Sequence, residues 1–316
     1  MLHIRRSKNP FSLLVCFFLF FVCLQTSNAG AQEASNIYIG KLNFLEEKVI
    51  TDLSAITQTA SYTNQPYFFS EHELYYTQAV ANASGDKSEQ MDTFLYNVLE
   101  QSSTNLTNSK ESEYSPTPLP SRKGFSVIRV NEAGKQELWS YNKEGEALKH
   151  LVPTIEPVGY QVWLNKDELL LFVLGEPNTL QRVDTREPLA KGQIIDNKIG
   201  ASLFRFQQSD WFLYTRQHDT NKAPMLKAYN ASTRKVVDIG SLPENSQYFS
   251  VSATGHLLTS DTLKLHHKRL TISGGKPVFK GPWTQVVVGN EDCQSGISRT
   301  AISNFGDRVA LVCESK

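Results

Sequence analysis

The residue patterns that usually carry chemistry are scarce in this sequence of 316 residues. It contains no Gly-x-Ser-x-Gly nucleophile elbow, Gly-rich phosphate loop, Cys-x-x-Cys pair or His-Glu-x-x-His zinc motif. The histidines His266 and His267 are adjacent, and adjacent side chains on a strand point to opposite faces, so the two cannot chelate one ion together. We therefore predict no catalytic, cofactor-binding or metal-binding residues. Glu291-Asp292 is interpreted as a solvated acidic loop, with a contribution to calcium binding as the alternative.

The N-terminus predicts a cleaved signal peptide, residues 1–31. His3, Arg5, Arg6 and Lys8 make a basic start, residues 11–24 form an apolar run of 14, and Ala29-Gly30-Ala31 is a small-residue cleavage site. The run is too short to span a bilayer, so we expect cleavage after Ala31, with Ala29 as the alternative. A lipoprotein modified at Cys23 is disfavoured because bulky residues precede that cysteine. The mature protein is expected to be periplasmic or secreted, without stable membrane insertion.

Two cysteines remain after this cleavage, Cys293 and Cys313. Both fall near one end of the same predicted hairpin, and an exported protein folds in an oxidising compartment that permits disulfides. We predict a disulfide between them, with two unpaired thiols as the alternative. Closing a loop of about twenty residues in this way contributes roughly 3 kcal/mol in the chain-entropy model.

The elements that must position any functional site recur at a regular spacing. Six short polar turns are each followed at once by a compact apolar run, and their last residues are separated by 51, 44, 42, 45 and 51 positions. The turns lie at residues 70–73, 121–124, 165–168, 207–210, 252–255 and 303–306. Self-similarity at roughly 40–50 residues is typical of β-propeller blades.

The apolar runs are short and rich in β-branched and aromatic residues, which favours strands over helices. A second short segment precedes each turn, and a further strand pair follows, as at residues 136–141 and 147–152. Four strands per repeat predict a propeller blade. After removal of the leader about 285 residues remain, which fits six blades of roughly 45 residues.

The two ends of the chain predict how the ring closes. Residues 36–42 and 49–53 form an outer hairpin with no inner hairpin before it, whereas the sixth repeat ends after its inner hairpin, residues 298–313. Pairing the two halves completes a sixth blade and leaves no strand edge exposed. We predict an all-β, six-bladed propeller over residues 32–316, closed by N- and C-terminal strands that share one blade.

Residues 114–139 carry a recognisable motif. Tyr114-Ser115-Pro116, the turn and strand at 120–130, and Gly134-Lys135-Gln136-Glu137-Leu138-Trp139 resemble the blade motif of TolB-type, WD40-like (PD40) propeller repeats. Residues 303–310 are similar to the same turn and strand, and residues 252–257 are a weaker copy. The resemblance implies a six-bladed propeller. It implies little about activity, because such propellers serve as scaffolds, ligand binders and enzyme appendages.

Several tryptophans and arginines invite a functional interpretation, but packing is favoured. We expect a core position for Trp139, Trp163 and Trp211, whereas Trp283 is less determined. Arg129 and Arg205 lie beside apolar strand residues and are expected to be structural. The polar stretches 82–90 and 101–115 are interpreted as exposed loops, with a binding lip as the alternative.

Charge and the absence of motifs together favour a binding module. The chain has 32 Lys and Arg against 32 Asp and Glu, and loss of Arg5, Arg6 and Lys8 with the leader takes the net charge from zero to minus three. No basic stretch then remains for nucleic acid or an anionic membrane. We predict a monomeric, non-enzymatic propeller that uses no cofactor and binds a protein or small ligand on one face.

The alternative is a channel-centred enzyme of the metal-dependent lactonase or hydrolase type. Such chemistry needs several acidic and Asn side chains that converge on the axis from different blades. The predicted inner strands 160–164, 201–206 and 249–251 carry no carboxylate.

Overall fold

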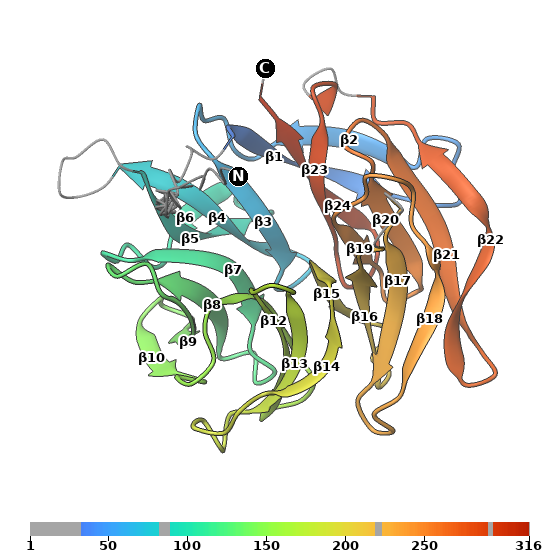
Figure 1. Ribbon diagram of the computed structural model, residues 1–316. Coiled ribbons are helices and arrows are strands. Elements are labelled where there is room, and N and C mark those ends of the chain that lie inside the picture. Colours follow the sequence, from blue (N-terminus) through green and yellow to red (C-terminus); the bar gives the residue numbers. More distant parts are fainter. Residues whose placement is uncertain (1–32, 82–88, 219–222, 290–292, 316) are drawn as a thin grey trace, which may run out of the picture. The chain divides into compact units, whose positions relative to one another are not determined.

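A computed structural model describes residues 33–81, 89–218, 223–289 and 293–315. The predicted signal peptide and its cleavage site at Ala31 lie outside the described residues. Six four-stranded antiparallel sheets are arranged as the blades of a propeller (Figure 1). The prediction of an all-β, six-bladed propeller is therefore confirmed. Within the described residues, no helix has the length and apolar character needed to cross a membrane.

Blades 1 to 5 each use four consecutive strands, ordered from the channel outward. Blade 1 contains β3 (Thr63–Phe68), β4 (Glu73–Ala81), β5 (Glu89–Asn97) and β6 (Ser102–Asn105). Blade 2 contains β7 (Ser112–Pro118), β8 (Gly124–Val130), β9 (Gln136–Asn142) and β10 (Ala147–His150). Blade 3 contains β11 (Val158–Trp163), β12 (Glu168–Val173), β13 (Thr179–Asp184) and β14 (Gln193–Asn197). Blade 4 contains β15 (Ile199–Arg205), β16 (Trp211–Arg216), β17 (Met225–Asn230) and β18 (Val236–Ser241). Blade 5 contains β19 (Phe249–Val251), β20 (His256–Ser260), β21 (Leu265–Ser273) and β22 (Lys276–Val286).

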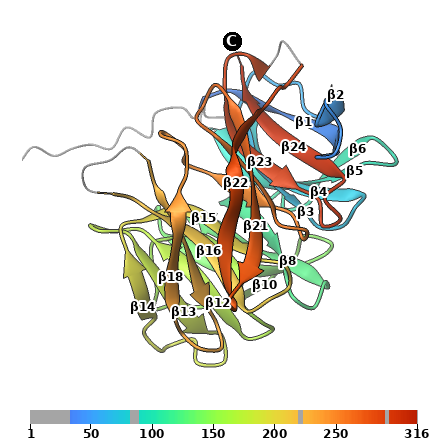
Figure 2. The same cartoon turned by 90° about the vertical axis from the view of Figure 1, so that its right-hand side faces the viewer.

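Blade 6 joins the two ends of the described chain. Its strands, from the channel outward, are β23 (Ile297–Ile302), β24 (Arg308–Glu314), β1 (Ser35–Leu42) and β2 (Ile50–Ala55). Strand β1 lies antiparallel to β24, in register from Ser35 opposite Glu314 to Lys41 opposite Arg308 (Figure 2). The predicted closure by terminal strands is confirmed, and it satisfies the backbone groups that an open ring would leave unpaired.

Apolar side chains that alternate along the strands pack between neighbouring blades. Ile37 and Ile39 of β1 pack with Leu74 and Tyr76 of β4, so the closing blade shares a core with blade 1. The outermost strands are more polar and more exposed, because one side of each has no neighbouring strand. The cores therefore lie in wedges around the ring, and the inner strands are left to form the channel.

Cys293 and Cys313 form a disulfide with their Cα atoms 4.8 Å apart. The bond links the segment before β23 to the end of β24 across 20 residues of sequence. Both cysteines are buried among apolar side chains of blades 5 and 6, including Leu258 and Leu265. The covalent link thus reinforces the blade that closes the ring.

The interpretation of residues 101–115 as an exposed loop is wrong. This segment contains β6 and the first half of β7, and Glu113 within it is completely buried. Strand β6 has a polar sequence because it is the outer edge of blade 1, where the backbone ladder with β5 holds it in place. Strand β7 buries the polar residue Glu113, whose Oε1 atom accepts a hydrogen bond from the Tyr141 hydroxyl.

Candidate functional site

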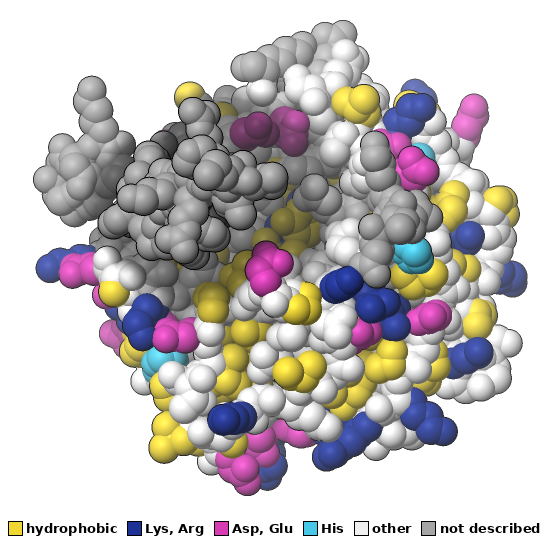
Figure 3. Space-filling view, in the orientation of Figure 1, with side chains coloured by type: hydrophobic (Ala, Val, Ile, Leu, Met, Phe, Trp, Pro, Cys, Tyr) yellow, Lys and Arg dark blue, Asp and Glu magenta, His cyan; other side chains and the backbone are white. Residues whose placement is uncertain are grey.

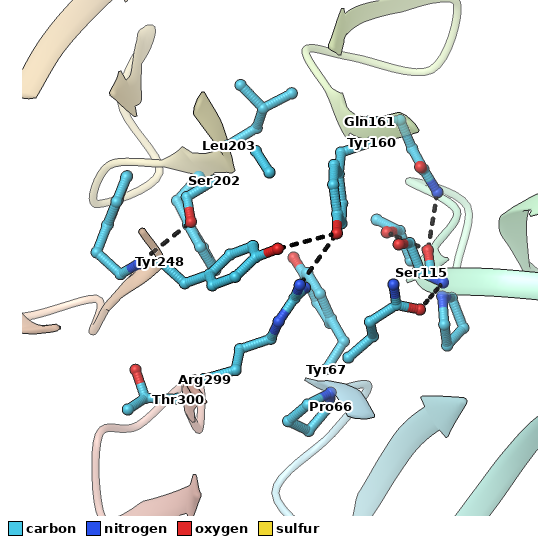
Figure 4. Close-up of a pocket in the computed structure, with 16 residues that line it drawn as sticks. Pro66, Tyr67, Ser115, Tyr160, Gln161, Ser202, Leu203, Tyr248, Arg299 and Thr300 are labelled. Atoms are coloured by element: carbon cyan, nitrogen blue, oxygen red, sulfur yellow. Dashed lines mark hydrogen bonds between the residues drawn. The ribbon is translucent and has the colours of Figure 1, made fainter. Parts of the chain in front are cut away.

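The inner strands of all six blades meet at a central channel that holds a cavity of about 60 Å³ (Figure 4). None of the described residues that line it is Asp, Glu or Asn. The lining residues are Gln65, Pro66, Tyr67, Ser115, Pro116, Thr117, Tyr160, Gln161, Ala201, Ser202, Leu203, Phe204, Tyr248, Phe249, Arg299 and Thr300. The site is thus aromatic and polar, and its one charged side chain is a cation.

Irregular backbone on the inner strands aims several of these side chains at the channel. The pairing register shifts between Asn64 and Tyr67 on β3, and between Tyr114 and Thr117 on β7. Within these two irregularities, Gln65 has φ 58° and Ser115 has φ 55°, a conformation that non-glycine residues rarely adopt. Such bulges redirect side chains and are common beside functional sites.

Arg299 crosses the channel from blade 6 to blade 3. A register shift between Ile297 and Arg299 interrupts the pairing of β23 with β24. The Nη2 atom of Arg299 donates a hydrogen bond of 3.0 Å to the hydroxyl of Tyr160, and the guanidinium lies 3.8 Å from the ring centre of Tyr248. Figure 4 shows Arg299 reaching toward Tyr160 with Tyr248 alongside. The two tyrosine hydroxyls are 3.4 Å apart, so the three side chains form one contact group, here called the Arg299 cluster.

The Arg299 cluster holds a positive charge that lacks a negative partner. Burial acts to lower the pKa of Arg299, but nearby tyrosine hydroxyls raise it above its ordinary value, so the guanidinium stays charged. Burial raises the pKa of Tyr248 to about 12, which keeps that phenol neutral. Burial acts to raise the pKa of Tyr160, but the Arg299 charge and the hydrogen bonds with Tyr248, Arg299 and Gln65 together outweigh it, so that pKa is lowered. Among the described residues no carboxylate forms an ion pair with Arg299, and its Nε atom is buried without a hydrogen bond.

A polar belt joins blades 1, 2 and 3 beside this cluster. The Gln65 Oε1 atom accepts a hydrogen bond of 2.7 Å from the backbone N–H of Ser115. Gln161 donates from Nε2 to the Ser115 carbonyl at 3.0 Å. The Ser115 Oγ and Gln161 Oε1 atoms are buried and have no partner among the described residues. The belt therefore offers a hydroxyl donor and an amide acceptor that the protein itself leaves unused.

A wider depression of about 680 Å³ adjoins the channel. It lies on the face formed by the turns that join the first and second strands of the blades, here called the turn face. Pro66, Tyr67 and Phe204 line both cavities, which places the depression at the channel mouth. Its other lining residues are Phe68, Phe69, Ser70, Glu71, Arg122, Lys143, Arg205, Gln207, Gln208, Val251, Ala253, Ala301, Ile302, Ser303, Asn304 and Phe305.

The depression combines apolar and cationic side chains. Phe305 is 76% exposed although it is a large aromatic residue. The cations of Arg122 and Lys143 lie 5.3 and 5.2 Å from the ring centre of Phe69. The Glu71 carboxylate accepts a 3.0 Å hydrogen bond from the backbone N–H of Phe305, which fixes the turn that presents this ring. The lining of the depression thus combines one exposed aromatic ring with several cations and the Glu71 carboxylate.

His266 and His267, adjacent on β21, have different contact partners. The Nε2 atom of His266 lies 2.8 Å from the Asp261 carboxylate, whereas the Nε2 atom of His267 lies 2.8 Å from Nδ1 of His256. Phe44 stacks on both His256 and His267, a contact that the sequence did not indicate. No group of three or more possible metal ligands occurs among the described residues. Glu291 and Asp292 lie outside them.

The tryptophans and the two arginines have mostly structural surroundings. Trp211 is buried in the core between blades 4 and 5, and Trp163 is partly buried against the core of blades 2 and 3. Trp139 is also partly buried, and Arg129 lies 4.7 Å from its ring centre while pairing with Glu111 at 2.6 Å. Trp283 packs edge-on against Phe279 at the rim of blade 5. Arg205 binds the carbonyl of Ser209 within its own turn and also lines the depression.

Sequence reasoning missed the Arg299 cluster. One signal could have found it, because the channel residues Gln65, Ser115, Tyr160 and Arg299 lie 8, 9, 8 and 7 positions before the last residue of their turns. Aligning the repeats on those turns would have placed an arginine and a tyrosine at equivalent inner positions.

Comparison with known proteins shows similarity in fold only. No protein-family model and no curated protein matches the sequence. A solved structure described as TolB from Agrobacterium tumefaciens has a TM-score of 0.63 at 11% identity, covering 90% of this chain and 99% of that one. TolB from Acinetobacter baumannii gives a TM-score of 0.50 at 9% identity, covering 89% of this chain and 64% of that one. A gluconolactonase from Xanthomonas campestris gives a TM-score of 0.56 at 8% identity, covering 90% of this chain and 96% of that one. The chain therefore has the six-bladed propeller fold of TolB-type structures, as its blade motif implied.

Proposed function

We propose that this chain is an exported, non-enzymatic binding module whose partner is a protein or peptide that docks on the turn face. The observation that carries this proposal is the depression of about 680 Å³ at the channel mouth, whose lining includes the exposed Phe305 and the cations Arg122, Lys143 and Arg205. Aromatic and arginine side chains are the residue types that supply most of the binding energy at protein interfaces. The cations favour a partner segment that carries acidic residues.

The surface charge supports a protein partner over nucleic acid. On the face shown in Figure 3, cationic and anionic side chains are interspersed and form no patch of a single sign. Nucleic-acid binding proteins instead gather Lys and Arg along one face or stripe. The whole sequence has equal numbers of basic and acidic residues, which also favours a protein partner over nucleic acid.

The channel-centred enzyme is a weaker explanation of this site. A metal-dependent lactonase or hydrolase needs oxygen ligands that converge on one ion. The described residues around the cavity include no Asp, Glu or Asn, and Arg299 places a positive charge where a cation would have to bind. The similarity in fold to a gluconolactonase does not supply the missing ligands.

Export is supported by the signal-peptide pattern and by the disulfide between Cys293 and Cys313. We expect protein purified from the cell envelope to begin at Gln32 and to contain no free thiol. Intact-mass measurement after alkylation under denaturing, non-reducing conditions checks both points. A chain that still begins at Met1, a lipid at Cys23, or two alkylated cysteines would contradict the proposal.

Docking on the turn face predicts a position-specific crosslink. A photoreactive phenylalanine analogue at position 305 is expected to capture one partner in envelope extract, because this side chain projects from the depression. The matched control places the same analogue at Val287, which is also 76% exposed but follows the last strand of blade 5, at the opposite end of the blades. Mass spectrometry of the adducts identifies the partner and the contact.

The two positions separate the possible outcomes. Capture at 305 and not at 287 supports docking on the turn face, and Arg122→Ser should reduce its yield several-fold. Capture at 287 alone would move the interface to the other face. Turnover of lactones by the purified mature protein, lost on substitution of a channel residue, would establish the enzymatic alternative instead.

A further inference from the structure

We propose that Arg299 is the receptor for a single carboxylate group, which enters the channel from the turn face. The inference deepens the proposed function, on which it rests, because it assigns a ligand chemistry to the channel behind the docking surface. The Arg299 guanidinium lines a cavity bounded by six blades and has no carboxylate partner among the described residues. A buried charge without a counter-ion is costly, so such a group is normally paired or serves to bind a ligand.

The geometry leaves part of the guanidinium free for a ligand. Tyr248 covers one face at 3.8 Å, and the Tyr160 hydroxyl takes one Nη2 hydrogen bond of 3.0 Å. The Nε atom is buried and makes no hydrogen bond to a described residue. Since a guanidinium presents its donors in a planar fork that matches a carboxylate, an anion at this edge would satisfy donors that remain unused.

The polar belt extends the same site. Ser115 lines the cavity, and its Oγ atom is buried and lacks a described partner, so its hydroxyl is available to donate to a second oxygen of the ligand. The unused Gln161 Oε1 atom is an acceptor and requires a donor, which a bound water or the rest of the ligand can supply. The left-handed backbone at Ser115 shows that this position is held by its surroundings in a conformation of higher energy.

Size and charge select a carboxylate over larger anions. A cavity of about 60 Å³ holds a few water-sized groups, at roughly 10–15 Å³ for each. A carboxylate brings one negative charge to match one cation. A phosphate dianion would place a second charge in a site where the described lining offers no other cation.

The test follows the arginine Nε–H signals of the mature, disulfide-bonded protein by NMR with ¹⁵N-labelled arginine. The Arg299 signal is assigned by its loss in Arg299→Lys. Sodium acetate is expected to move this signal until it saturates, with a dissociation constant of the order of millimolar. Arg129 is the internal control, because its Nε atom is equally buried and unbonded but its guanidinium already pairs with Glu111. Acetamide and sodium chloride are the neutral and ionic controls.

Two further arms distinguish the source of the carboxylate. N-acetyl-Ala-Ala-Phe carries a chain-terminal carboxylate, and its C-terminal amide lacks it. Binding of the acid at least tenfold tighter than acetate, with no binding of the amide, identifies a peptide terminus as the ligand. Equal binding of acetate and the acid identifies a free small carboxylate.

Some results would overturn the inference. The first is that neither acetate nor the peptide acid moves the Arg299 signal to saturation. The second is that acetamide moves the Arg299 signal as much as acetate does, and the third is that acetate moves the Arg129 signal as much as the Arg299 signal. In Arg299→Met, the ring signals of ¹³C-labelled Tyr160 and Tyr248 should no longer respond to acetate. If that variant fails to fold, the wild-type titrations alone decide. A failed acetate titration beside a specific crosslink at 305 would reject the carboxylate site and leave the docking proposal intact.

Discussion

Deletion of residues 32–54 is expected to abolish folding of the propeller. These residues supply β1 and most of β2, and their loss leaves β24 as an unpaired edge in blade 6. The deletion removes five buried apolar side chains, Ile37, Tyr38, Ile39, Leu42 and Ile50. At about 2 kcal/mol for each, the loss is on the order of 10 kcal/mol, compared with a total stability of about 5–15 kcal/mol for a typical domain. Circular dichroism and size-exclusion chromatography should show unfolded or aggregated protein.

A control in the same hairpin separates this effect from any change near the N-terminus. Leu45 lies in the turn between β1 and β2 and is 93% exposed, so Leu45→Ser should leave the melting temperature within a few degrees of wild type. A monomeric deletion variant that melts at the wild-type temperature would show that the termini do not close the ring.

Glu113→Gln is expected to stabilise the protein by about 3 kcal/mol at pH 8. Glu113 is completely buried in β7, where its Oε1 atom accepts hydrogen bonds from Ser109 and Tyr141 and its Oε2 atom has no described partner. Burial raises the pKa of this carboxyl from 4.5 to about 7. Each pKa unit corresponds to about 1.4 kcal/mol, so ionisation of the folded protein costs roughly 3 kcal/mol. Glutamine keeps the shape and carries no charge.

The pH dependence gives this effect a definite sign. The unfolded chain loses the Glu113 proton near pH 4.5, whereas the folded protein keeps it up to pH about 7. Between these values Glu113 binds more protons in the folded state, so its contribution to wild-type stability falls as the pH rises, and that loss is nearly complete at pH 8. Urea unfolding at pH 4, 6 and 8 should show the advantage of Glu113→Gln growing from near zero to its full value.

Glu111→Gln is the matched control, because it lies two residues away and has the opposite electrostatics. The hydrogen bond from Arg129 lowers the pKa of Glu111, so its contribution to stability is present above the pKa of the unfolded chain and is lost as the pH falls. Glu111→Gln should therefore be less stable than wild type at pH 8, with the difference shrinking in acid. Parallel stability profiles for wild type and Glu113→Gln would contradict the assignment.

The fold was largely predictable because its determinants are local and repeated. Each turn and the apolar run after it lie within a few residues of each other, so the spacing of six such units indicated the blade count and the closing blade. The outer strand β6 could not be predicted in the same way. Its residues Ser102–Asn105 are polar, and only the backbone ladder with β5 makes them a strand.

The candidate site was not predicted, because it depends on contacts between distant residues and on irregular backbone, and only an alignment of the repeats on their turns would have pointed to it. Arg299 and Tyr160 are 139 residues apart and meet only because blades 3 and 6 face each other across the channel. Arg129 and Arg205 drew attention as arginines beside apolar strand residues. A register shift of β23 instead brings Arg299 to the axis, and no local pattern in the sequence indicates that shift.

The shared closing blade also determines the order in which the protein can be completed. Strand β1 leaves the ribosome before the other described strands, but its ladder partner β24 ends at Glu314 and is made last. During synthesis the N-terminal hairpin therefore has an open edge, and the ring can close only when the residues of β24 are available. Folding must wait for the pairing of β1 with β24. Contacts between strands so far apart in sequence form slowly, and the open edge is prone to aggregation until they form. A nascent chain of this protein thus depends on whatever protects open strand edges until β24 has been made.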